Sequence, residues 1–207
     1  MLNVVVVNGL WLSGQETFLL RKRIESAGFD TRLFTYRSVA DDLDTNAARL
    51  AAFVADRIGG GLHLVGHSLG GLVILRMLER HRLRVGGRIV CLGSPLRGSV
   101  AAEALARLPG GAKLLGRSIG AALVDGPQQT WSGTEELGLL AGSAGLGCGR
   151  FICDLPKPHD GSVAVEETRL DGASDHVVLP VSHLSMLASR AVAEQVVSFL
   201  SNGHFEH

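Results

Sequence analysis

The sequence predicts an α/β protein with a mostly parallel central sheet and helices on both of its faces. Short apolar segments alternate with helical segments three times between residues 4 and 92, which is typical of βαβ units. The first apolar segment, 4–7, is valine throughout, as in a parallel strand that is buried on both faces. The length of 207 residues is closer to one domain than to two.

The individual elements follow from apolar periodicity and from the residues that end each segment. Strands are expected at 4–7, 31–36, 62–65, 88–92, 137–141 and 177–181. Apolar residues at helical spacing predict helices at 15–27, 42–58, 69–81, 100–108 and 184–200. Gly28 ends the first of these helices, and the glycines at 59–61 end the second.

Residues 94–134 fit the alternating pattern least well. They contain scattered glycine, proline and serine and one apolar helical stretch. We expect this segment to form either a small cap over a site or a long connection with one helix in it. Residues 1–207 as a whole are expected to form a single domain.

Composition argues against several classes of protein. Lys and Arg number 20, Asp and Glu number 20, and the formal net charge is zero, which argues against a nucleic-acid-binding protein. No apolar run approaches the roughly 18 residues of a membrane span, and the first residues lack the positive flank of a signal peptide. We therefore expect no integral membrane segment and a cytoplasmic location. The cysteines Cys91, Cys148 and Cys153 form no zinc pattern; Cys148 and Cys153 could pair, but free thiols are the expectation in a reducing cytoplasm.

The most specific motif is Gly66-His67-Ser68-Leu69-Gly70, which fits G-x-S-x-G. A predicted strand precedes it and a predicted helix follows it, as this motif requires. Ser68 would then lie on a sharp strand-to-helix turn that leaves no room for side chains at the two glycines. Its hydroxyl would lie at a helix N-terminus, where backbone N–H groups and the helix dipole favour a developing negative charge. The pattern predicts a nucleophilic serine.

A nucleophilic serine needs a base, and the base needs a group that orients it. We expect His183 to be the base, because it follows the last predicted strand directly, at the edge where a parallel sheet places its site. His159 and His176 are the alternatives. His67 lies next to Ser68 in the motif, and its side chain is expected to point away.

The orienting acid is expected to be Asp160, in a turn that the following Val163 and Val165 would dock firmly. Asp175 and Asp154 are the alternatives. The chain order of serine, acid and histidine is that of one class of hydrolase.

An oxyanion hole requires two backbone donors. The motif supplies the N–H of Leu69, and the loop after the first strand is placed to supply the N–H of Leu10. Trp11, Leu12 and Trp131 are expected to line the substrate site together with part of 94–134. This chemistry requires no metal and no organic cofactor.

With these pieces assembled, the sequence resembles the α/β-hydrolases, and most of all their small bacterial lipase- and esterase-like members. The resemblance covers nearly the whole chain and rests on VVVVNGLW, LHLVGHSLGGLVI, HDGSVAVEETRLDG and LPVSHLSML. It implies a reduced α/β-hydrolase fold without the first antiparallel strands. Family members often have His-Gly in the first loop, where this chain has Asn8-Gly9; we expect Asn8 to hold that loop by hydrogen bonds. Residues 94–134 do not resemble a large lid, which favours an open site for modest-sized acyl groups.

These features predict a serine hydrolase that cleaves carboxylic esters of small molecules through a Ser68–His183–Asp160 triad and an acyl-enzyme intermediate. The same triad would serve a thioesterase or an acyltransferase, because the pocket selects the leaving group and the acceptor. A non-catalytic binding module with the α/β-hydrolase fold is the third hypothesis, since fold alone does not imply activity. The sequence gives no indication of an oligomeric state.

Overall fold

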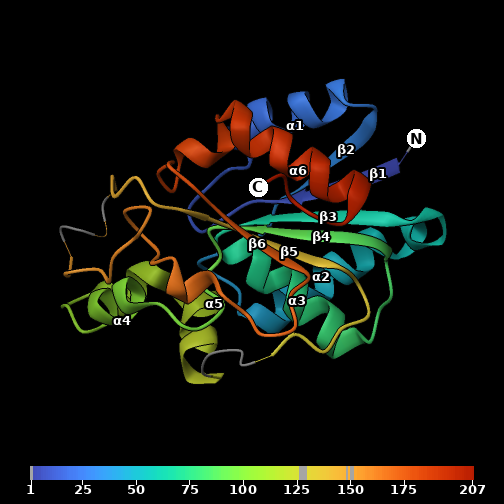
Figure 1. Cartoon of the computed structure of the whole chain (residues 1–207). Coiled ribbons are helices and arrows are strands. Elements are labelled where there is room, and N and C mark those ends of the chain that lie inside the picture. Colours follow the sequence, from blue (N-terminus) through green and yellow to red (C-terminus); the bar gives the residue numbers. More distant parts are fainter. Residues whose placement is uncertain (1, 126–129, 148, 150–151) are drawn as a thin grey trace.

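The central sheet has six strands in the order β2-β1-β3-β4-β5-β6 (Figure 1). The computed structural model describes residues 2–125, 130–147, 149 and 152–207. The strands are β1 (Leu2–Val7), β2 (Phe29–Phe34), β3 (Leu62–His67), β4 (Gly86–Leu92), β5 (Leu137–Gly142) and β6 (Asp175–Leu179). Each neighbouring pair is parallel, which confirms the predicted fold class.

Helices cover both faces of the sheet. On one face lie α1 (Phe18–Ser26) and α6 (Arg190–Asn202), and on the other lie α2 (Leu43–Val54) and α3 (Leu69–His81) (Figure 1). Short 3-10 turns occur at Gln15–Thr17, Ala55–Gly60, Glu166–Thr168 and Ser185–Leu187.

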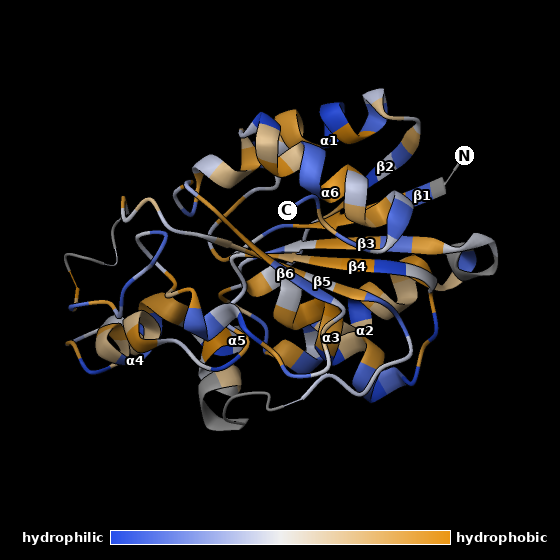
Figure 2. Ribbon diagram, viewed as in Figure 1, coloured by the Kyte–Doolittle hydropathy of each residue, from blue (hydrophilic) through white to orange (hydrophobic). Residues whose placement is uncertain are grey.

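The core has two apolar layers, one on each side of the sheet. Val5 and Val7 belong to the layer that includes α2 and α3, whereas Val4 and Val6 belong to the layer that includes α1 and α6. All four valines are fully buried, and Figure 2 shows the apolar strands between the two helical layers. Because successive side chains of a strand alternate between faces, burial on both faces explains why β1 is apolar at consecutive positions.

The strand order creates a switch point between β1 and β3. The chain moves from β1 to β2 on one side, and then returns to β3 on the other side of β1. Val7 at the end of β1 pairs with Gly66 near the end of β3. The loops that follow these two strands therefore leave the same edge of the sheet side by side, which is where ligand sites form in open parallel sheets.

The described part of 94–134 contains two helices rather than the single helix that was expected. They are α4 (Val100–Ala106) and α5 (Gly111–Asp125), beyond the carboxyl ends of the strands (Figure 1). Helix α5 gives a weak sequence signal because it contains three glycines, one of which, Gly116, interrupts it with a φ of 77°. Tertiary contacts hold it instead: the Arg117 N–H donates to the Val39 carbonyl at 2.9 Å.

Several boundaries also differ from the prediction. Strand β2 begins at Phe29 rather than at 31, because it pairs in register with β1 from its first residue. Strand β6 begins at Asp175 rather than at 177, because Asp175 already pairs with Gly138 of β5. Helix α6 begins at Arg190 rather than at 184, because Ser189 caps it by accepting a hydrogen bond from the N–H of Val192.

Candidate active site

The turn between β3 and α3 holds Ser68 in a strained backbone conformation. Its φ of 54° and ψ of −123° lie in a region that a residue with a side chain rarely adopts. Neither glycine of the motif has room for a side chain: a Cβ on Gly66 would lie 2.6 Å from the backbone nitrogen of Gly71, and one on Gly70 would overlap the carbonyl oxygen of Val7. Ser68 precedes the 13-residue helix α3 as its N-cap, and its side chain makes no capping hydrogen bond.

Asp160 and His183 lie in contact, although 22 residues separate them in the sequence. The ring Nδ1 of His183 donates a hydrogen bond to Asp160 Oδ2 at 2.7 Å, and the main-chain N–H of His183 donates to the Asp160 carbonyl at 2.9 Å. Because a carboxylate only accepts, the proton of a neutral His183 lies on Nδ1. The other ring nitrogen, Nε2, is then able to accept a proton.

The carboxylate of Asp160 is held on both of its oxygens. Oδ1 accepts hydrogen bonds from the N–H groups of Ser162 at 2.9 Å and Val163 at 2.7 Å, and the residue is 1% exposed. Gly93, directly after β4, makes room for the pair: a Cβ there would lie 3.1 Å from both Asp160 Oδ2 and His183 Nδ1. Sequence reasoning missed Gly93, for which the only signal was a glycine at the end of a predicted strand.

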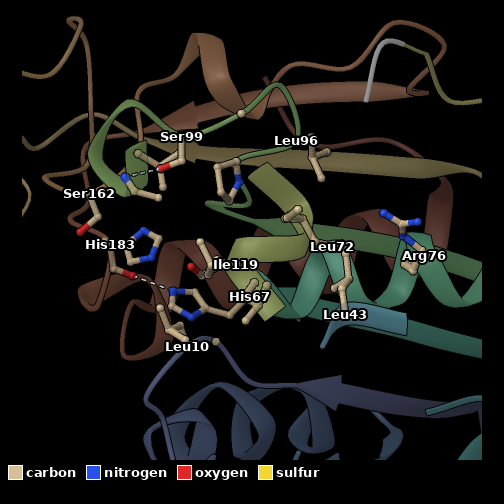
Figure 3. A pocket seen from close by; sticks show the side chains of 18 of the residues that line it. Leu10, Leu43, His67, Leu72, Arg76, Leu96, Ser99, Ile119, Ser162 and His183 are labelled. Atoms are coloured by element: carbon tan, nitrogen blue, oxygen red, sulfur yellow. Dashed lines mark hydrogen bonds between the residues drawn. The ribbon is translucent and has the colours of Figure 1, made fainter. Parts of the chain in front are cut away.

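His67 does not point away from the site as expected. It lines the same cavity as Ser68, and its ring packs against that of His183 with 4.8 Å between centroids (Figure 3). Its Nε2 donates a hydrogen bond to the main-chain carbonyl of His183 at 2.9 Å. The prediction considered the motif alone, whereas the loop after β6 packs against this residue. Burial, together with the nearby His183, lowers the pKa of His67 to about 3, so the ring is neutral.

The loop after β1 passes directly beside the serine. The Asn8 side-chain amide donates to the carbonyl of the next residue at 3.1 Å and to the Leu12 carbonyl at 2.8 Å, which confirms that Asn8 holds the loop. A Cβ on Gly9 would lie 3.1 Å from the Cβ of Ser68. The two residues predicted to supply the oxyanion hole, Leu10 and Leu69, both line the cavity.

A cavity of about 1100 Å³ extends from Ser68 and His183 along α3 (Figure 3). Apolar side chains from four helices and one loop supply much of its lining: Leu43, Leu72, Leu96, Leu105, Leu115 and Ile119. The expected substrate-site residues Trp11, Leu12 and Trp131 also line it. Small-molecule sites usually measure about 300–1,000 Å³, so this cavity lies slightly above that range.

Helices α4 and α5 are fastened to the loops that carry the site. The Trp11 indole N–H donates to the Leu114 carbonyl of α5 at 3.0 Å. The Glu167 carboxylate accepts from the N–H of Val100, the first residue of α4, at 2.6 Å and from the N–H of Ala164 at 2.7 Å. Burial raises the pKa of Glu167. One carboxylate therefore joins the start of α4 to the loop that follows Asp160.

The alternative acids and bases either form other hydrogen bonds or face solvent. His159 accepts a hydrogen bond from the backbone of its own turn. His176 lies within β6, where it hydrogen-bonds a threonine side chain. Asp175 accepts from the backbone N–H groups of His176 and Phe205, and Asp154 is exposed to solvent. Of the predicted candidates, the structure brings together Asp160 and His183.

The remaining sequence expectations concern metals, membranes and thiols. Among the described residues, no group of three or more His, Cys, Asp and Glu side chains could hold a metal ion. Within the same part of the chain, no helix has both the length and the apolar character needed to cross a membrane. Cys91 and Cys153 are free thiols, and Cys148 lies outside the described residues.

The sequence matches a known family, and the fold resembles that of solved structures. The model of the alpha/beta hydrolase family matches residues 4–207. A search of curated proteins by sequence found no match. Among solved structures, the mature form of a lipase from Bacillus licheniformis is 22% identical with a TM-score of 0.77, over 97% of this chain and 91% of that one.

Two further structures are similar at lower identity. A thermophilic esterase from Thermogutta terrifontis is 16% identical with a TM-score of 0.68, over 99% of this chain and 91% of that one. A type II thioesterase from the yersiniabactin biosynthetic pathway is 15% identical with a TM-score of 0.64, over 99% and 94%. At these identities the structural likeness shows a shared fold.

Proposed function

Because the chain belongs to the alpha/beta hydrolase family, we propose that it is a serine hydrolase that cleaves carboxylic esters with Ser68, His183 and Asp160 as its catalytic triad. The observation that carries this proposal is the 2.7 Å hydrogen bond between His183 Nδ1 and Asp160 Oδ2, at a cavity that a strained serine also lines. Because this bond holds the ring proton on Nδ1, Nε2 of His183 is the nitrogen that acts as the base.

The reaction follows from these positions. The Ser68 hydroxyl attacks the ester carbonyl while His183 Nε2 takes its proton, and the ring then gives that proton to the leaving alcohol. Asp160 holds the ring and stabilises the imidazolium that forms. A water molecule, activated by the same ring, then attacks the acyl-enzyme and releases the carboxylic acid.

The negative charge on the carbonyl oxygen needs two backbone donors. We assign this role to the N–H groups of Leu10 and Leu69. The support for Leu10 is the position of its loop, since a Cβ on the preceding Gly9 would lie 3.1 Å from the Cβ of Ser68. The support for Leu69 is its place as the first residue of α3, where N–H groups lack intrahelical partners.

The acyl chain would occupy the apolar part of the cavity, between α3 and the pair α4–α5. Leu72 lies one turn of α3 beyond Ser68, and its side chain lines this space. Residues 94–134 would then act as a small cap on one α/β-hydrolase domain formed by residues 1–207. Trp11, Leu12 and Trp131 would contact the substrate from the cavity wall.

Pre-steady-state hydrolysis of p-nitrophenyl esters, from acetate to palmitate, tests the proposed reaction. We expect a burst of nitrophenol stoichiometric with enzyme, followed by slower turnover, and no burst from Ser68→Ala. A folded wild-type protein without a burst or turnover would contradict the proposal and favour a non-catalytic module. Faster turnover of acyl-coenzyme A than of any ester would reassign the protein as a thioesterase.

A leucine-to-tryptophan exchange tests the location of the acyl chain. Leu72→Trp should raise KM for long-chain esters while acetate hydrolysis stays near the wild-type rate. Leu19→Trp, on the exposed face of α1, is the matched control and should change neither. An unaltered chain-length preference in Leu72→Trp would place the acyl chain elsewhere.

A further inference from the structure

His67 makes a contact with the proposed base that the triad does not require. Its Nε2 lies 2.9 Å from the main-chain carbonyl oxygen of His183, and the two rings meet at 45° (Figure 3). A carbonyl oxygen only accepts, so the proton of His67 lies on Nε2. The residue is 2% exposed, which keeps water from replacing this hydrogen bond.

The bond joins two parts of the site that are distant in sequence. The bonds from the ring and main chain of His183 to Asp160 attach it to the loop between β5 and β6. The bond from His67 attaches it to the end of β3, one residue before Ser68. Reacting groups must be held within a fraction of an ångström. A hydrogen bond between the residue before Ser68 and the loop that carries His183 therefore restrains the distance between the Ser68 hydroxyl and the His183 ring.

The loop after β1 covers the other ring nitrogen of His67. Nδ1 is buried, with no hydrogen-bond partner in the described part of the chain. A Cβ on Gly9 would lie 3.0 Å from it, so the loop after β1 covers this side of the ring. The ring therefore lies between that loop and His183, with its single donor directed at the carbonyl.

We propose that His67 is a positioning residue that sets the distance between Ser68 and His183 through its hydrogen bond to the His183 carbonyl. This inference rests on the proposed triad. His67 touches no reacting atom in this account and acts through the histidine loop. Its neutrality is compatible with this role, because a neutral neighbour does not repel the charge that His183 acquires in the reaction.

Two substitutions separate the hydrogen bond from simple packing. His67→Phe keeps an aromatic ring against His183 and removes the donor. His67→Gln removes the ring and keeps an N–H group at nearly the position of Nε2. If positioning is the role, His67→Phe should lower kcat and the rate of Ser68 labelling by a fluorophosphonate about 10- to 100-fold with little change in KM, and His67→Gln should recover most of that loss.

A buried histidine on the same strand supplies the matched control. His63 lies at the start of β3, far along the strand from His67, and is 4% exposed. Its Nδ1 accepts a hydrogen bond from the main-chain N–H of Arg88 in β4. His63→Phe should lower the melting temperature and leave kcat and labelling rate near the wild-type values. The comparison shows whether loss of stability alone accounts for the effect at His67.

The outcomes separate this inference from the proposed function. Wild-type kcat and labelling in His67→Phe, whatever its melting temperature, would overturn the positioning role and leave the triad intact. Equal losses in His67→Gln and His67→Phe would also overturn it, because the donor would then be irrelevant. If His67→Phe fails to fold, the milder His67→Asn replaces it, because the asparagine side chain is too short to reach the His183 carbonyl. A wild-type rate in His67→Asn would overturn the positioning role, and a 10- to 100-fold loss would support it. An inert wild-type protein would overturn the proposed function and this inference together.

Discussion

Replacing Asp160 by asparagine changes the candidate site by one atom. In the native protein, Asp160 Oδ1 accepts two backbone N–H groups and Oδ2 accepts the His183 ring proton. The new amide keeps its oxygen on the backbone donors, so its NH₂ group faces His183 Nδ1. Because an NH₂ group donates, the ring must now accept at Nδ1 and carry its proton on Nε2. The base is then unable to take the proton of Ser68.

The size of the effect follows from this change of tautomer. The same substitution in a serine protease triad lowers kcat about 10⁴-fold while geometry is preserved, which corresponds to about 5.5 kcal/mol at 1.36 kcal/mol per tenfold. The backbone hydrogen bonds of the turn survive, so we expect the melting temperature to change little. Asp160→Asn should therefore separate catalysis from folding.

The assay is steady-state hydrolysis of p-nitrophenyl butyrate, with circular dichroism to verify the fold. Asp175→Asn is the control, since Asp175 lies at the start of β6 and holds the backbone of Phe205 near the C-terminus. Its kcat should stay near the wild-type value. A folded Asp160→Asn with kcat within tenfold of wild type, or a larger loss in Asp175→Asn, would refute the assignment of the acid.

Three further predictions concern folding and reactivity. Gly70→Ala should lower the melting temperature strongly or prevent folding, because a Cβ there would overlap backbone oxygens at the end of β1. Gly120→Ala should be tolerated, because a Cβ at that position meets nothing within 4 Å. Equal melting temperatures of the two variants would contradict the packing argument. Burial lowers the pKa of His67 to about 3 and of His176 to about 4, so the folded state binds fewer protons than the unfolded state below pH 6.5. Urea unfolding should then show stability falling as the pH drops below 6.5, with fully buried His67 contributing a loss of about 1.4 kcal/mol per pH unit near pH 5, while the raised pKa of Glu167 acts in the opposite direction. Equal slopes in the wild type and in His67→Phe would refute the lowered pKa of His67. Burial raises the pKa of the Cys91 thiol to about 12, so iodoacetamide should alkylate it only after unfolding, and modification of the native protein would contradict its burial.

The sequence allowed the central part of the fold to be predicted because local and tertiary signals agree there. Helix α3 has the predicted bounds, since the motif glycines fix its start and its apolar face packs on the sheet. The buried valines of β1 and the short strand β3 carried equally clear patterns. The position of Ser68 in a strained turn follows from the same steric argument that the motif implies.

The parts that were not predicted depend on contacts between distant segments. Helix α5 forms although glycines weaken it, because the Ser118 hydroxyl donates to the Asp41 carbonyl and accepts from the Asn46 amide of α2. The hydrogen bond from His67 to the His183 carbonyl depends on the loop after β6, which no local pattern places beside β3. The start of α6 was missed although it has a local signal, the capping Ser189.

Labelling with a fluorophosphonate, read by intact mass and peptide mapping, tests the central claim most directly. The account predicts one adduct per chain, located on Ser68, that forms much more slowly in His183→Ala. Both proteins should be folded, with circular dichroism as the check. An adduct on another residue, no adduct on the folded wild-type protein, or equal labelling in His183→Ala would contradict the proposal that His183 activates Ser68.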